Sequence, residues 1–175
     1  MDPINPFPNG TLAPDFTLLD LASMPHSLTD YRNRIVIINF WSAECPWSQR
    51  CDLELLSLLE GWGEEVTLLA IASNANEPLE MLVQVSAERG LPTVLQDVDQ
   101  ASADLYGAQT TPHLFVLDED GIIRYQGAFD DITFRQRDVT EHYLQDAVDK
   151  LLTGSLPEPA QTSPYGCVLV RHNPE

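Results

Sequence analysis

Cys45 is the residue of this chain best placed for chemistry, because it stands between an apolar strand and the start of a helix. The β-branched run 35–38 predicts a strand buried on both faces, and Pro46 suits a first helical turn, where its missing N–H costs nothing. Cys45 is therefore expected at a helix N-terminus, which favours the thiolate. The helix dipole alone lowers a thiol pKa by less than about one unit, so we expect a moderately activated nucleophile.

Two further cysteines could form a disulfide with an oxidised Cys45. Cys51 lies six residues along the same predicted helix, a rise of roughly 9 Å, whereas bridged cysteines need Cα atoms about 4.4–6.8 Å apart. That pair could bond only if the helix start unwound, and Cys51 also continues an apolar stripe that favours a core position. Cys167 lies in a proline-containing tail, where a mobile segment could reach its own site or a neighbouring subunit's. The sequence leaves open whether Cys51, Cys167 or an external thiol acts as the resolving partner.

Two segments in the expected order resemble landmarks of the thioredoxin superfamily. The segment 40–46, Phe-Trp-Ser-Ala-Glu-Cys-Pro, resembles the strand, loop and active-site helix of that superfamily. Thr111-Pro112, followed by the apolar run 113–118, resembles its cis-proline and next strand. The resemblance implies an α/β fold, a thioredoxin-like three-layer sandwich with a central mixed β-sheet flanked by helices and with an N-terminal extension.

Other segments narrow the resemblance to the redoxin branch, the peroxiredoxin-like proteins grouped with alkyl hydroperoxide reductase and thiol-specific antioxidant. These segments are the opening at 13–18, the strand pair around 119–121 and the run 125–131. The Gly166-Cys167 pair resembles the C-terminal Gly-Cys of one peroxiredoxin-like subfamily. The resemblance thus covers essentially the whole chain.

Departures from the family pattern limit the chemistry that carries over. Ser48 stands where a dithiol thioredoxin has its second active-site cysteine, and Asn39 stands where it has a buried acid. Ser42 fits the Thr or Ser that precedes a peroxidatic cysteine, but Ile38 replaces the proline of that motif. The arginine that polarises the peroxide is also missing, and His113 or Arg124 could take its place. A slower peroxidase is therefore expected.

The resemblance implies a thiol-dependent oxidoreductase, either an antioxidant peroxidase-like enzyme or a thiol–disulfide oxidoreductase. Its expected partners are a peroxide or disulfide substrate and a thiol reductant such as thioredoxin or a small thiol. Trp41, Pro46 and Trp47 flank the cysteine and could form a hydrophobic lip for the substrate. The candidate catalytic residues are Cys45 as nucleophile with Ser42, Ser48, Thr111 and Pro112.

A second hypothesis is a binding module that has lost turnover. Such a protein would hold extended or unfolded chains along the cis-proline groove. The missing arginine, proline and second cysteine favour it. Trapping would distinguish the two, since a catalytic Cys45 forms mixed disulfides with client thiols, whereas a binding module holds its clients even as Cys45→Ser.

Composition excludes several other classes. The chain has 175 residues, enough for one domain with a sizeable core, and its net charge of −18 disfavours nucleic acid and anionic membranes. Three cysteines do not form a secreted disulfide framework, and the four histidines show no zinc spacing, so no metal or cofactor is expected. The start lacks the pattern of a signal peptide. We expect a cytoplasmic protein, monomeric or homodimeric, that acts in cell redox homeostasis.

Hydrophobic periodicity and turn residues divide the chain into an entry segment (1–12), a redoxin domain (13–154) and a tail (155–175). The last helix is expected to begin near Asp138, which forms a capping-box pattern with Glu141. Adjacent acidic pairs such as Asp130-Asp131 are expected to be solvated. The pattern predicts strands at 15–18, 35–41, 66–72, 93–95, 113–118 and 122–128, and helices at 46–60, 78–89, 100–106 and 138–154.

Overall fold

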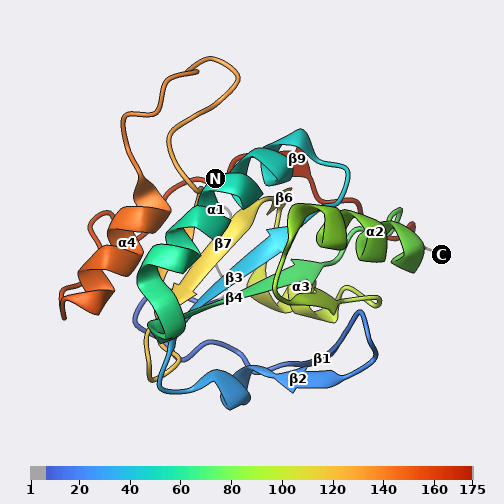
Figure 1. Ribbon diagram of the computed structural model, residues 1–175, viewed down its shortest axis with the longest axis horizontal. Coiled ribbons are helices and arrows are strands. Elements are labelled where there is room, and N and C mark those ends of the chain that lie inside the picture. Colours follow the sequence, from blue (N-terminus) through green and yellow to red (C-terminus); the bar gives the residue numbers. More distant parts are fainter. Residues whose placement is uncertain (1–6, 175) are drawn as a thin grey trace.

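The computed structural model describes residues 7–174 and confirms the thioredoxin-like α/β architecture (Figure 1). A seven-stranded mixed sheet has the order β2-β1-β5-β4-β3-β7-β8, and β6 and β9 form a separate two-stranded ladder. The strands of the main sheet are β1 (Thr17–Asp20), β2 (Pro25–Ser27), β3 (Ile35–Trp41), β4 (Val66–Ala72), β5 (Val94–Gln96), β7 (His113–Leu117) and β8 (Ile123–Gly127).

The central strand β3 positions the reactive segment. It pairs in parallel with β4 and antiparallel with β7, and all seven of its residues are buried. Its side chains alternate between two cores, as a strand covered on both faces requires. The helices are α1 (Pro46–Trp62), α2 (Leu79–Arg89), α3 (Ala101–Tyr106) and α4 (Tyr143–Leu152), with 3-10 turns η1 (Leu28–Tyr31) and η2 (Gly63–Glu65).

Helices α1 and α4 cover one face of the sheet, where Ile37, Leu55 and Val148 share a core. Helix α2 lies on the same face through Leu82, and α3 packs on the opposite face through Tyr106. The hydrophobic effect holds these layers together, because each helix buries its apolar stripe against the sheet. Among the described residues, no helix is both long enough and apolar enough to cross a membrane.

The predicted start of the last helix was wrong. Helix α4 begins at Tyr143, not near Asp138. The carboxylate of Asp131 accepts hydrogen bonds from the backbone N–H groups of Thr140 and Glu141, at 2.9 and 3.1 Å, and from the Thr140 hydroxyl. These bonds hold residues 131–141 as a loop, so the first helical turn forms later.

The tail runs back across the domain and does not hang free (Figure 1). Thr162 donates its backbone N–H to Gln126 O at 3.0 Å, and its hydroxyl lies 2.7 Å from that of Tyr125. Further along, the strand β9 (Cys167–Val168) pairs antiparallel with β6 (Thr110–Thr111). At the other end of the chain, residues 7–12 lie beside β8 through a bridge between Leu12 and Ile122, while residues 1–6 of the expected entry segment lie outside the described residues.

Candidate active site

Cys45 lies at the N-terminal cap of α1, four residues after the end of β3. Pro46 occupies the first helical position, where no backbone N–H is needed. The Cys45 N–H donates to Ser42 Oγ at 3.0 Å, and the Cys45 carbonyl accepts from the N–H of Gln49 at 3.0 Å. Because both backbone groups of Cys45 are bonded, its backbone is held at the positive end of the helix dipole.

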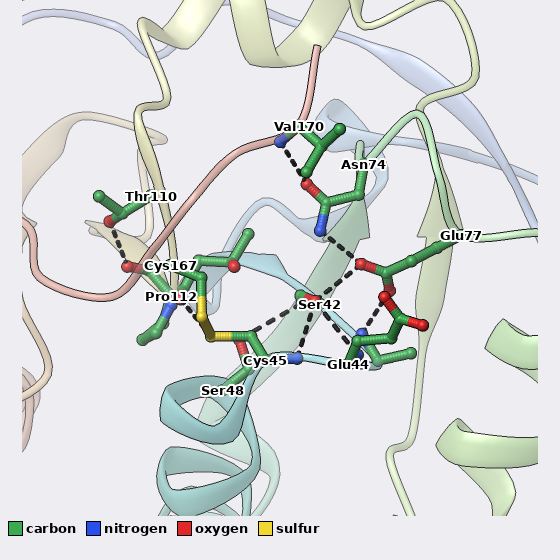
Figure 2. Close-up of a disulfide and its surroundings, with 12 residues drawn as sticks. Ser42, Glu44, Cys45, Ser48, Asn74, Glu77, Thr110, Pro112, Cys167 and Val170 are labelled. Atoms are coloured by element: carbon green, nitrogen blue, oxygen red, sulfur yellow. Dashed lines mark hydrogen bonds between the residues drawn. A yellow bond between two sulfur atoms is a disulfide. The ribbon is translucent and has the colours of Figure 1, made fainter. Parts of the chain in front are cut away.

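A disulfide joins Cys45 to Cys167, which is 122 residues later in the chain (Figure 2). The two Cα atoms are 6.1 Å apart, within the range of bridged cysteines. Cys51 is free and only 1% exposed, and it lies on the buried side of α1, where it packs with Leu55 and Ile37. Burial raises the pKa of the Cys51 thiol. The structure thus pairs Cys45 with the tail cysteine of its own chain, and Cys51 has the surroundings of a core residue.

The tail reaches Cys45 by forming a short ladder beside the cis peptide bond Thr111-Pro112. Thr111 is the register partner of Cys167, and its carbonyl oxygen lies 3.1 Å from Cys45 Sγ. Gly166 fits against the same carbonyl, since an added Cβ would lie 2.2 Å from Thr111 O. The tail can therefore run this close to Thr111 only if the residue before Cys167 has no side chain.

Contacts after Cys167 hold the tail independently of the disulfide. Leu169 is 3% exposed within the main core, and its N–H donates to Gln109 O at 3.0 Å. The N–H of Val170 donates to Asn74 Oδ1 at 2.8 Å, while its carbonyl accepts from Ala75 N at 3.0 Å. Arg171 adds an ion pair of 2.6 Å with Asp104 and a hydrogen bond to the Ala108 carbonyl.

Glu77 organises the loop that precedes Cys45 (Figure 2). Its carboxylate accepts from the Ser42 hydroxyl at 2.7 Å, from the Ala43 N–H at 2.5 Å and from the Asn74 amide. Ser42 was predicted to be a catalytic residue beside Cys45, at the position of the Thr or Ser that precedes a peroxidatic cysteine. A hydroxyl has one hydrogen, and here Ser42 directs it to Glu77 while its oxygen accepts from the N–H groups of Cys45 and Glu44. In this oxidised state Ser42 positions the loop and does not donate to the sulfur.

A buried ion pair supports the same loop from the other side. Arg89 lies 2.9 Å from the Asp52 carboxylate and also donates to the carbonyl oxygens of Ser42 and Ala43. Asp52 also accepts from Trp41 Nε1 at 2.8 Å. Burial raises the pKa of Asp52, and the hydrogen bonds from Trp41 and Arg89 oppose that shift. The ion pair links β3, α1 and α2 directly below the reactive cysteine.

The predicted hydrophobic lip is wrong for Trp41. That side chain is fully buried among Ala70 and Leu82, because its indole N–H bonds to Asp52 inside the protein. Trp47 is half-buried and packs edge-on against Tyr165 of the tail, with ring centroids 5.0 Å apart. Pro46 is exposed.

The remaining predicted site residues are brought near Cys45 by the start of α1 and by β6. Ser48 is buried, and its oxygen accepts from the Ser42 N–H at 3.3 Å. The Thr111 carbonyl lies beside the disulfide, and Pro112 follows it next to the two sulfurs (Figure 2). Asn39, at the position of the thioredoxin acid, is 1% exposed, and its amide has no hydrogen-bond partner among the described residues.

Neither cation proposed to replace the missing arginine can do so. His113 is 6% exposed, its Nδ1 accepts from the Gln109 N–H, and burial lowers its pKa to about 4, so the ring is neutral at pH 7. Arg124 is bound to Asp118 at 2.7 Å. The expectation that Asp130 is solvated was also wrong. It is 3% exposed and makes two hydrogen bonds of 2.8 Å to the Arg50 guanidinium, which compensates a buried carboxylate.

Glu77, Asn74, Arg89 and Asp52 were not found from the sequence. A usable signal existed for the first two, because the run 74–77 follows β4, the parallel neighbour of β3. Parallel strands carry the segments after their carboxyl ends to the same edge of a sheet, so this run had to lie near Cys45. Among residues 7–174, no group of three or more His, Cys, Asp or Glu side chains is arranged to hold a metal ion.

Comparison with known proteins is consistent with this architecture. Residues 9–126 match the AhpC/TSA family. A relative from Geobacillus thermodenitrificans, named thiol-disulfide oxidoreductase ResA, is 36% identical over 122 residues, which span 66% of this chain and 66% of that protein.

Two solved structures match nearly the whole chain. An uncharacterised conserved protein from Geobacillus kaustophilus is 29% identical with a TM-score of 0.89, and the match covers 98% of this chain and 96% of that one. A hypothetical protein from Sinorhizobium meliloti is also 29% identical, with a TM-score of 0.84 and coverage of 94% and 95%. These two matches cover more of this chain than the match with the relative from Geobacillus thermodenitrificans does.

Proposed function

Because the chain belongs to the AhpC/TSA family within the thioredoxin-like superfamily, we propose that it is a thiol-dependent oxidoreductase whose redox centre is the Cys45–Cys167 pair. The observation that carries this proposal is the disulfide at the start of α1, beside Thr111-Pro112. Ser48 replaces the second cysteine of a dithiol motif, and the tail supplies a second sulfur in its place. Thiol–disulfide exchange is the reaction that best fits this pair.

The reaction balances as a two-electron exchange. One thiolate attacks a sulfur of the Cys45–Cys167 bond, which releases the other cysteine as a thiolate and leaves a mixed disulfide. A second thiolate then attacks the mixed disulfide, so two external thiols become one disulfide and the protein holds two thiols. The reverse sequence reduces an external disulfide. The contacts of Leu169, Val170 and Arg171 in the oxidised protein do not involve the disulfide, and we expect them to keep Cys167 close to Cys45 in both directions.

A redox titration tests this proposal. In buffers of defined dithiothreitol potential, the wild-type protein should show one two-electron transition, read by thiol labelling and mass spectrometry. Cys45→Ser and Cys167→Ser should each abolish the transition, whereas Cys51→Ser, which removes a cysteine outside the pair, should retain it. If no disulfide forms in oxidising buffer, or if Cys45→Ser reduces disulfide substrates as well as the wild type, the proposal is wrong.

The family match favours a second reaction for the same pair. The Cys45 thiolate would attack a peroxide oxygen, the O–O bond would break, and the leaving oxygen would take a proton to become an alcohol or water. The Cys167 thiol would then attack the sulfenic sulfur and release water, forming the observed disulfide. Reduced protein should then lose its Cys45 thiol to peroxide much faster than free cysteine does. Loss at the rate of free cysteine would leave disulfide exchange as the reaction.

The tail also bears on the alternative of a binding module. In the oxidised protein, residues 166–169 occupy the groove beside Thr111-Pro112 where a client chain would lie. A client must displace these residues, including the buried Leu169. Capture of unfolded chains at equal levels by the Cys45→Ser variant and by the oxidised wild-type protein would favour the binding module over the enzyme.

A further inference from the structure

The two sulfurs of the disulfide differ in access. Cys45 is 3% exposed, because α1 continues below it and the Thr111 carbonyl lies 3.1 Å from its sulfur. Cys167 is half-buried and belongs to the tail, which lies over the domain. A thiolate attacks whichever sulfur it can reach, and the rate also rises when the departing thiolate is a good leaving group. Cys45, at a helix N-terminus, is the better leaving group of the two.

A pocket of about 170 Å³ opens directly onto the disulfide. Its lining includes Ser42, Glu44 and Glu77 of the domain and Val168 and Val170 of the tail. Figure 2 shows the two carboxylates on the same side of the sulfur–sulfur bond. The volume suits a small thiol better than a folded protein surface.

The charge of this pocket is negative. Its lining residues include two carboxylates and no cationic side chain. Arg89 contacts the neighbouring loop carbonyls but is paired with Asp52, and Arg171 of the tail is paired with Asp104. Glu44 is exposed and makes no ion pair among the described residues, so its charge acts on whatever enters. The net charge of −18 adds a repulsive field for anions at longer range.

From these observations we propose that the pocket is the entrance for the external thiol, that this thiol is small and either neutral or cationic, and that it attacks Cys167. The incoming thiolate forms a bond with Cys167 Sγ, the bond to Cys45 breaks, and Cys45 leaves as a thiolate. A second molecule of the same thiol releases Cys167 and departs as the symmetric disulfide. This assignment rests on the proposed exchange function and adds the reacting sulfur and the class of reductant.

Stopped-flow reduction of the oxidised protein by three thiols of similar size tests the charge preference. The probes are cysteamine, β-mercaptoethanol and mercaptoethanesulfonate. The rate at which each thiol reduces the protein is expressed per thiolate and is divided by the rate at which the same thiol reduces hydroxyethyl disulfide. We expect cysteamine to exceed mercaptoethanesulfonate by at least about tenfold at low ionic strength, and added salt should reduce the ratio. Equal normalised rates for the three thiols would overturn the proposal.

A matched pair of variants ties the preference to the pocket. Glu44→Gln should lower the ratio of the cysteamine rate to the mercaptoethanesulfonate rate by about threefold. Glu64→Gln, which removes the same charge in η2 beyond the C-terminal end of α1, should leave this ratio unchanged. A ratio that Glu44→Gln does not change, or that Glu64→Gln changes equally, would show that the pocket is not the entrance.

Rapid acid quenching followed by alkylation identifies the attacked sulfur. At the earliest times, the mixed disulfide should be on Cys167 and the alkyl group on Cys45. The opposite pattern would overturn the assignment to Cys167 while leaving the exchange function intact. A protein that none of the three thiols reduces would instead contradict the exchange function itself.

Discussion

Gly166 packs against the carbonyl of Thr111 so closely that a single added carbon atom would lie 2.2 Å from the oxygen. Thr111 is also the residue whose carbonyl lies 3.1 Å from Cys45 Sγ. The position of the tail and the environment of the reactive sulfur are therefore coupled through one backbone group. A change at either residue should alter the stability of the disulfide.

Gly166→Ala should make the disulfide easier to reduce. The new methyl group must push the tail away from Thr111, which weakens the pairing of β9 with β6. A cost of about 1–3 kcal/mol is typical of overpacking, and 1.4 kcal/mol corresponds to about 30 mV for a two-electron couple. Equilibrium titration in dithiothreitol buffers measures the potential. Gly61→Ala, on α1 with open space around it, is the control, and equal potentials in both variants would contradict the coupling.

Arg89→Ala should destabilise the protein by about 3–5 kcal/mol, because it leaves the buried Asp52 carboxylate without its partner. Replacing both residues, as Arg89→Met with Asp52→Asn, should cost less than Arg89→Ala alone, since no uncompensated charge remains. Urea unfolding monitored by fluorescence gives the free energies of unfolding. A double variant less stable than Arg89→Ala would show that the ion pair itself stabilises the fold.

Cys51 should resist alkylation in the folded, reduced protein. Its side chain is buried and burial raises its pKa, so the reactive thiolate is scarce. Iodoacetamide should modify the other two cysteines first and Cys51 only after unfolding in urea, as peptide mass spectrometry will show. Labelling of Cys51 at a rate close to that of Cys167 in native buffer would refute its assignment to the core.

The stability of the protein should fall between pH 6.5 and pH 4 because of His113. Burial lowers its pKa from 6.5 to about 4, so in this range the unfolded chain binds a proton that the folded protein does not. Above pH 6.5 the ring is neutral in both states and His113 does not lower the free energy of unfolding. As the pH falls from 6.5 toward 4, that free energy decreases by about 3 kcal/mol in total. His113→Gln should flatten this part of the stability curve, whereas His142→Gln, at an exposed position, should not. Parallel stability curves for His113→Gln and the wild type would show that His113 does not cause the loss of stability in this pH range.

Local sequence patterns predicted the elements that carry the reactive cysteine. The run 35–41 is the buried central strand, and Pro46 begins the helix behind Cys45, as expected. Gly90 ends α2 and Gly107 ends α3 in left-handed conformations. These features depend on residues close together in the chain, so periodicity and turn chemistry were sufficient to place them.

Contacts between distant residues were decided only by the tertiary structure. The sequence left both Cys51 and Cys167 open as partners of Cys45, although it favoured a core position for Cys51. In the folded chain the partner is Cys167, 122 residues after Cys45, because β9 pairs with β6 beside the reactive sulfur. Likewise, the sequence predicted a solvated Asp130, whereas in the folded protein its carboxylate is buried beside the guanidinium of Arg50. The sequence alone determined that a cysteine lies at the start of a helix in a thioredoxin-like fold. The groups that surround this cysteine come from segments that are distant in the sequence. They contact one another only when the sheet and the tail are assembled, so no local sequence pattern predicts these contacts.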